Sequence, residues 1–160
     1  MFISVGKISS SRNGIYFCVV FLIYFAFQFT TAVISNHFDP TLTSSSLKFN
    51  SLQEEFIITV LIGPAVETLI FQYLIIETLL SLKMTQIVSA IISGLLFGIS
   101  HCYNLPYILV TTVVGLIFAY YYMRLRHQGL VNTLGLVTLL HALSNIFAFV
   151  NNNFFNITDW

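Results

Sequence analysis

Five long apolar runs occupy most of this chain, and they limit its possible folds more than any other feature. Crossing roughly 30 Å of hydrocarbon takes about 20 apolar residues in a helix. Only 8% of the 160 residues are charged, whereas a soluble domain has about a quarter. The sequence therefore predicts an all-α, polytopic transmembrane helix bundle of about five spans, with residues 1–160 in a single membrane domain. We place the spans at residues 15–35, 56–82, 85–101, 105–123 and 131–150.

The basic residues divide unequally between the two ends of such a bundle. Only Lys48 falls at one end, and the opposite end has the others: Lys7, Arg12, Lys83, Arg124 and Arg126. Loops rich in Lys and Arg remain in the cytoplasm, so we expect a cytoplasmic N-terminus and an outer C-terminus. The small size and this bias favour a multi-pass protein of a bacterial cell membrane. Because the net charge is zero, we expect membrane lipid and no nucleic acid as a partner.

Four polar residues lie inside these apolar runs, on three different spans. They are Glu67, His101, His141 and Asn145. A charge at the bilayer centre costs about 3 kcal/mol on insertion scales, so a carboxylate such as Glu67 is by default a candidate functional group. At about 1.5 Å of helix per residue, all four can meet at mid-depth or in the outer half of the membrane. A carboxylate and two imidazoles can together activate a water, stabilise an oxyanion or bind a metal.

The residues around Glu67 and His101 indicate local structure that supports such a site. Pro64 removes a backbone donor just before Glu67, so we expect a kink there that frees carbonyl groups. Small residues recur at four-residue spacing in the third span, which predicts close packing against another helix. These residues are Ser89, Ser93, Gly94 and Gly98.

Two further features favour structural roles at the inner end of the bundle. Glu77 lies beside Lys83, near the end of the second span. We expect it at the membrane interface, with no part in catalysis. The tyrosines at 120–122 predict an interfacial aromatic belt.

Three short motifs follow one another along these spans. They are Gly-Pro-Ala-Val-Glu-Thr-Leu-Ile-Phe-Gln at 63–72, Phe97-x-x-x-His101, and His141-x-x-x-Asn145. They resemble, in order and separation, the EExxxR, FxxxH and HxxxN motifs of the CPBP family of intramembrane proteases. That family includes CAAX prenyl endopeptidases and bacteriocin-processing enzymes and is also called the Abi family. The resemblance covers about residues 56–150, which we predict to be a CPBP-like catalytic core.

The resemblance implies a role for each motif residue. Glu67 would be the base that activates water, His101 and His141 would assist it, and Asn145 would help to form the oxyanion site. Two imidazoles and a carboxylate also match a catalytic zinc site, so these three would be the ligands if a divalent metal takes part. The same set works without a metal, and both alternatives remain open. The motif aromatics Phe71 and Phe97 would support the site.

The first motif departs from the family pattern at two positions. Thr68 stands in place of the second glutamate, and Gln72 stands in place of the arginine. Positions four apart share a helix face, so we expect a neutral hydrogen bond between Thr68 and Gln72 where the family can form an ion pair. The exchange keeps the presumed base and changes the charge and shape of its surroundings.

These features support three hypotheses. The first is an intramembrane endopeptidase, a hydrolase that cleaves a membrane-associated, prenylated or leader peptide. The second is a catalytically inactive relative that binds a partner or confers self-immunity against a bacteriocin, and the exchange at Thr68 and Gln72 motivates it. The third is a proton or metal-ion path. Two features argue against it: the polar residues form a compact set, and no series of ionisable groups continues toward the inner side.

Overall fold

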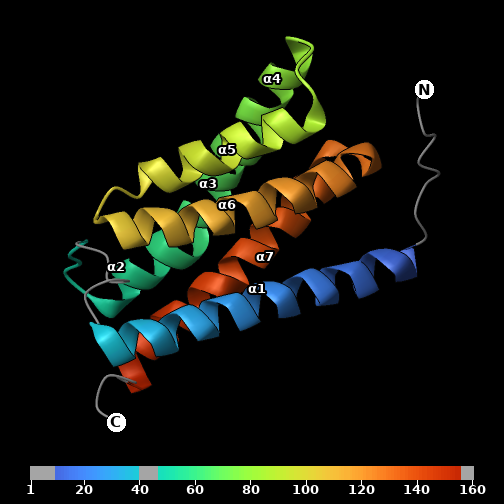
Figure 1. The fold of residues 1–160 in the computed structure, drawn as a ribbon. Helices are drawn as coiled ribbons and strands as arrows, with labels where there is room; N and C mark the ends of the chain where they lie inside the picture. The colour runs from blue at the N-terminus through green and yellow to red at the C-terminus, as the bar shows by residue number, and fades with distance from the viewer. Residues whose placement is uncertain (1–9, 40–46, 156–160) are drawn as a thin grey trace.

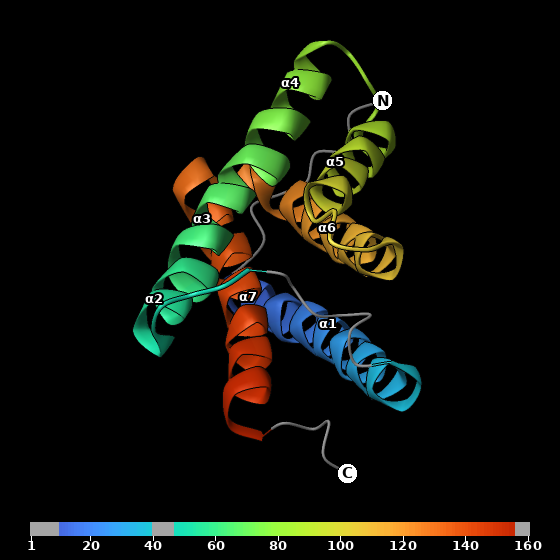
Figure 2. The same cartoon turned by 90° about the vertical axis from the view of Figure 1, so that its left-hand side faces the viewer.

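The computed structural model describes residues 10–39 and 47–155, and every regular element in them is a helix. The side chains of Lys7 and Arg12, which contribute to the predicted charge bias, lie outside the described part. The α-helices are α1 (Ser10–Phe38), α2 (Leu52–Phe56), α3 (Gly63–Glu67), α4 (Ile76–Ser81), α5 (Gln86–Ser100), α6 (Leu105–Leu125) and α7 (Leu130–Val150). Two π-helical stretches, Ile57–Ile62 and Thr68–Ile75, join α2, α3 and α4 into one continuous rod (Figure 2).

Within the described residues, four helical segments are long and apolar enough to cross a membrane, and α5 is a shorter apolar helix of 15 residues. The four segments are Asn13–Ser35, Leu52–Ser81, Leu105–Gln128 and Leu130–Phe154. Large apolar side chains cover much of the outer surface, for example Ile87 at 73% exposed and Val131 at 84%. Exposed apolar surface of this extent suits lipid and does not suit water. The predicted all-α polytopic bundle is confirmed, and its third span is the shortest.

The helix α7 lies at the centre of the bundle. It contacts the α2–α4 rod, α6 and α1, as Figures 1 and 2 show from two directions. The helices α5 and α6 form an antiparallel hairpin beside it, and α1 packs against α6 and α7. This central place of α7 matters for function because α7 carries His141 and Asn145.

The two ends of the bundle differ in charge, as the sequence predicts. In Figure 1 the start of α1, the α4–α5 turn with Lys83 and the α6–α7 turn with Arg126 lie toward one end. The α5–α6 turn and the ends of α1 and α7 lie toward the other end. Gly129 makes the turn into α7 with φ of 98°, a backbone conformation that glycine adopts without steric cost. The orientation of these ends in a membrane stays a prediction.

The small residues of α5 pack directly against α6. A Cβ atom placed on Gly98 would lie 2.8 Å from Thr112 Cα, and one placed on Gly94 would lie 2.9 Å from the backbone nitrogen of Leu116. Gly115 of α6 faces them, since a Cβ there would lie 3.0 Å from the Gly94 carbonyl oxygen. The predicted close packing of the third span is therefore confirmed, and it fixes the position of His101 at the end of α5.

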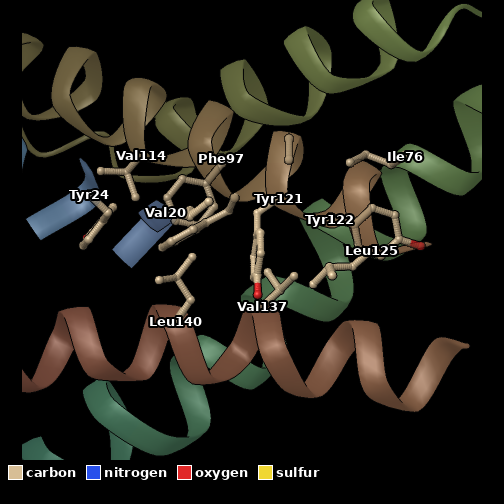
Figure 3. Close-up of a cluster of buried hydrophobic side chains, with 12 residues drawn as sticks. Val20, Tyr24, Ile76, Phe97, Val114, Tyr121, Tyr122, Leu125, Val137 and Leu140 are labelled. Carbon is tan, nitrogen blue, oxygen red and sulfur yellow. The ribbon is translucent and has the colours of Figure 1, made fainter. Parts of the chain in front are cut away.

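Aromatic and aliphatic side chains of α1, α5, α6, α7 and the rod form the core (Figure 3). Phe118 and Tyr121 are fully buried at 0% exposed, and Figure 3 shows the Tyr121 hydroxyl directed toward α7 beside Val137. The predicted interfacial belt is wrong for Tyr121 and for Tyr122, which is 2% exposed. Their helix continues past the predicted end of the span, so both side chains lie between helices. Only the third tyrosine of this group, Tyr120, is exposed, at 52%.

Glu77 pairs with Arg126 from the end of α6, and this partner was not evident from the sequence. Its Oε2 lies 2.7 Å from Arg126 Nη2, its Oε1 accepts from Arg126 Nε at 3.0 Å, and Tyr122 donates its hydroxyl to Oε1 at 2.8 Å. The planar guanidinium fits a carboxylate with two parallel bonds. These bonds tie α4 to α6 at the end of the bundle opposite His101.

Candidate active site

Glu67 lies where the rod passes from α3 into the second π-helical stretch. Gly63 lies one turn earlier, and a Cβ there would lie 2.9 Å from the Ile58 carbonyl oxygen, so the position has no room for a side chain. Short π-helical insertions within helices are frequent at functional sites. The Gly63–Pro64 pair therefore shapes the backbone directly before the carboxylate.

Two imidazole rings from two other helices face Glu67. His101 Nε2 lies 3.8 Å from Glu67 Oε2, and His141 Nε2 lies 3.6 Å from the same oxygen. Both separations exceed a direct hydrogen bond, and polar atoms at such distances are often bridged by water. Three of the four predicted site residues are thus brought together, from α3, the end of α5 and α7.

His101 is oriented by its own helix. Its backbone leaves the helical conformation with φ of −99° and ψ of 47°, and its Nδ1 lies 2.8 Å from the carbonyl oxygen of Phe97. A carbonyl only accepts hydrogen bonds, so Nδ1 carries the hydrogen. In the neutral ring, Nε2 is then an acceptor, and it faces the carboxylate of Glu67.

His141 is buried among aromatic rings. It is 3% exposed, and its ring centroid lies 4.6 Å from that of Phe118 and 5.7 Å from that of Phe97. Among the described residues, its Nδ1 has no hydrogen-bond partner. An N–H group directed at apolar rings is costly. We therefore assign the hydrogen of the neutral ring to Nε2, which faces Glu67.

Phe97 is the aromatic centre of the site. Its ring is 4.7 Å from that of His101, and it makes an edge contact with Phe71 at 5.4 Å. It also contacts His141, so both imidazoles rest against one ring. The FxxxH spacing places Phe97 and His101 on one face of α5, which explains why the two side chains touch.

Asn145 is held by the backbone of the rod. Its Nδ2 donates to the carbonyl oxygen of Thr59 at 2.7 Å. The carboxamide nitrogen has two hydrogens, so this bond uses one and leaves the second. The sequence predicted the amide one turn beyond His141 on α7; it did not predict its tie to Thr59.

The expected hydrogen bond between Thr68 and Gln72 is absent. Both side chains are 0% exposed, and among the described residues Thr68 Oγ1 and the two terminal polar atoms of Gln72 have no hydrogen-bond partner. Both lie in the π-helical stretch Thr68–Ile75.

Two tyrosines near His101 were not identified from the sequence. The Tyr107 ring stacks on His101 with centroids 6.1 Å apart, and it meets the Tyr103 ring at 5.1 Å. Burial, and then the negative charge of Glu67, raise the pKa of Tyr103 in the α5–α6 turn, so its phenol stays neutral. The only sequence signal for these two tyrosines is that they closely follow His101, the last residue of the FxxxH motif.

Nothing in the described residues supports the metal alternative, which stays a prediction. Among the described residues, no group of three or more His, Cys, Asp and Glu side chains is arranged to hold a metal ion. The predicted ligands Glu67, His101 and His141 are therefore assigned no step that passes through a metal. The chemistry assigned below uses only their protons and lone pairs.

The fold and the site together define a class: a multi-pass α-helical membrane protein with a carboxylate and two imidazoles between its helices. The model of the type II CAAX prenyl endopeptidase Rce1-like family matches residues 51–147. The chain belongs to this family of CAAX-type intramembrane proteases, and its resemblance to the CPBP family is confirmed. No curated protein and no solved structure matches the chain.

Proposed function

We propose that the protein is an intramembrane endopeptidase in which Glu67 activates a water to hydrolyse a peptide bond. The observation that carries this proposal is the convergence of His101 Nε2 and His141 Nε2 on Glu67 Oε2, at 3.8 and 3.6 Å. Geometry is the first test of a candidate base. Membership of a protease family supports the same reaction class.

The hydrogen-bonding roles of the three side chains suit one water. The carboxylate and His101 Nε2 are both acceptors, so a donor between them removes the repulsion of their lone pairs. A water that gives one hydrogen to Glu67 and the other to His101 satisfies both groups. His141 Nε2, assigned above as a donor, can then bind either Glu67 or the developing oxyanion.

The reaction balances with these residues alone. Glu67 takes a proton from the water as its oxygen bonds to the carbonyl carbon, and the carbonyl oxygen becomes an oxyanion. The second N–H of Asn145, together with His141, donates to that oxyanion. Glu67 then returns the proton to the leaving nitrogen as the carbon–nitrogen bond breaks. The products are a carboxylic acid and an amine, and the acid proton then passes to the amine to give a carboxylate and an ammonium group.

The substrate we propose is a peptide that lies in or near the membrane, either with a prenylated CAAX terminus or with a leader sequence. The family description supports the prenylated option. The charge bias of the bundle ends supports a cell membrane with the basic end toward the cytoplasm, and we propose a bacterial cell membrane as the location. Phe71 and Phe97 act as aromatic supports in this scheme, while Thr68 and Gln72 shape the buried side of the site.

Glu67→Gln tests the proposal. Gln has nearly the same shape and cannot take a proton from water, so cleavage of a prenylated CAAX peptide in lipid nanodiscs should fall at least about a hundredfold. The variant should insert and fold as the native protein does. Glu55→Gln is the matched control, because Glu55 Oε1 accepts a hydrogen bond from Asn153 near the end of the bundle and a Gln oxygen preserves it. Native-like cleavage by Glu67→Gln would rule out the assignment.

A second candidate function is partner binding without catalysis, as in self-immunity against a bacteriocin. The observation that favours it is the neutral, unpaired state of Thr68 and Gln72, described above. Under this alternative, Glu67→Ala cells should keep the full phenotype of the native gene. Loss of the phenotype with Glu67→Ala and its retention with Glu55→Gln would favour proteolysis.

A further inference from the structure

The Thr59 carbonyl is left without a helical donor by two features of the sequence that act together. In the π-helical stretch Ile57–Ile62 each N–H bonds five residues back, and Gly63 accordingly donates to the Ile58 carbonyl. The next donor in this register would be residue 64, five residues after Thr59. That residue is Pro64, which has no N–H.

Asn145 supplies the missing donor from another helix. Its Nδ2 lies 2.7 Å from the Thr59 carbonyl oxygen. An unpaired carbonyl in a membrane span is expensive, because lipid offers no replacement donor. The interaction therefore links the rod that carries Glu67 to the helix that carries His141, about two turns before Glu67 and about one turn after His141.

We propose that Pro64 and Asn145 form a positioning clasp in which the proline frees the Thr59 carbonyl and the carbonyl fixes the Asn145 amide. This inference rests on the proposed function for its catalytic consequence. The clasp sets the register of α7 against the rod, and so sets the separation of His141 from Glu67. It also directs the second N–H of Asn145, since a planar carboxamide with one fixed hydrogen has little freedom for the other.

A double-mutant cycle on stability tests the clasp without any need for substrate. Asn145→Leu removes the donor, keeps the branched arrangement of heavy atoms, and should lower the Tm of the purified protein by several degrees, about 2–8 °C. Pro64→Ala supplies an N–H in register with the Thr59 carbonyl. In the Pro64→Ala background, Asn145→Leu should therefore cost little or no Tm.

Pro106→Ala is the matched control. Pro106 lies in the first turn of α6, where the N–H has no intrahelical partner in any case. The loss of Tm from Asn145→Leu should be unchanged in the Pro106→Ala background. An equal loss in the native, Pro64→Ala and Pro106→Ala backgrounds would overturn the clasp.

Infrared spectroscopy provides a second measurement that does not depend on folding of the Pro64→Ala variant. With threonine labelled by ¹³C at the carbonyl, the difference spectrum between native protein and Asn145→Leu should show one band moved to higher frequency, as the Thr59 carbonyl loses its donor. An unshifted spectrum would contradict the proposal.

Kinetics separate the clasp from the proposed function. Release of Asn145 in Pro64→Ala should lower kcat about tenfold or more with little change in KM, because small displacements of catalytic groups are costly. The double variant should cleave no more slowly than Asn145→Leu alone. If no variant and no native protein cleaves, the proposed function fails while the Tm cycle still decides the clasp.

Discussion

At the scale of single residues, the polar groups inside this bundle fall into two kinds. Glu67, His101 and His141 face one another across gaps of 3.6 and 3.8 Å. Thr68 and Gln72 are 0% exposed, more deeply buried than Glu67 and His101, and no described group accepts or donates a bond to their side chains. The first kind suits chemistry, whereas the second lowers stability, because an unsatisfied buried polar group costs about 1–3 kcal/mol.

Thr68→Val should therefore stabilise the protein. Valine has nearly the shape of threonine and removes a hydroxyl that has no described partner, so the gain should be about 1 kcal/mol. Thermal unfolding in detergent measures it, and Ser144→Ala is the contrasting variant, since the Ser144 hydroxyl donates to the Leu140 carbonyl at 2.8 Å. A Tm that falls with Thr68→Val would show that the hydroxyl is bonded.

The residues of the site could be predicted from their type and spacing, but their bonds could not. The motifs at Glu67, His101 and His141 predict which side chains meet, because their residue types suit one reaction and their depths along three spans are similar. They do not predict that Asn145 bonds the Thr59 carbonyl, since that requires knowledge of the π-helical winding before Pro64.

At the scale of elements, the contact between α5 and α6 is set by backbone atoms. The two helices lie so close at their glycines that a Cβ added to Gly94, Gly98 or Gly115 would collide with the opposite helix. Membrane helices associate through such close packing, because lipid gives no hydrophobic drive between them. His101 lies three positions after Gly98, so the packing of this hairpin also determines where one imidazole lies.

Gly98→Ala should disturb stability and catalysis together. The added methyl group would overlap Thr112 Oγ1 and lie 2.8 Å from Thr112 Cα, which is backbone and cannot rotate away. Overpacking of this kind costs about 1–3 kcal/mol. Thermal unfolding and cleavage assays should both report a loss.

Gly135→Ala on α7 is the matched control for that experiment. No described atom lies within 4 Å of a Cβ placed there. It should keep native activity and should not lower the Tm, since alanine favours a helix more than glycine does. Equal Tm values for Gly98→Ala and native protein would contradict the packing argument.

At the scale of the whole molecule, the charge bias and the helix order agree. The end of the bundle with the α4–α5 and α6–α7 turns has three of the basic residues: Lys83, Arg124 and Arg126. The Glu77–Arg126 pair lies there too. The sequence predicted this bias from loop composition alone. It missed the Glu77–Arg126 pair, because 49 positions separate the partners and only the packed fold brings them together.

The predicted orientation places Cys102 at the outer surface. Cys102 is exposed and lies in the α5–α6 turn, next to His101. A membrane-impermeant maleimide should label it in intact cells of the Cys18→Ser variant, because the bundle end with few basic residues faces outward. Labelling only in inverted vesicles would reverse the orientation.

The brevity of α5 has a consequence for the surrounding bilayer. Its 15 residues reach roughly 22 Å at about 1.5 Å each, short of a hydrocarbon core of roughly 30 Å. A helix this short draws the lipid head groups inward on its side of the protein. We expect this thinning to bring the aqueous boundary closer to His101, which would supply water to the proposed hydrolysis.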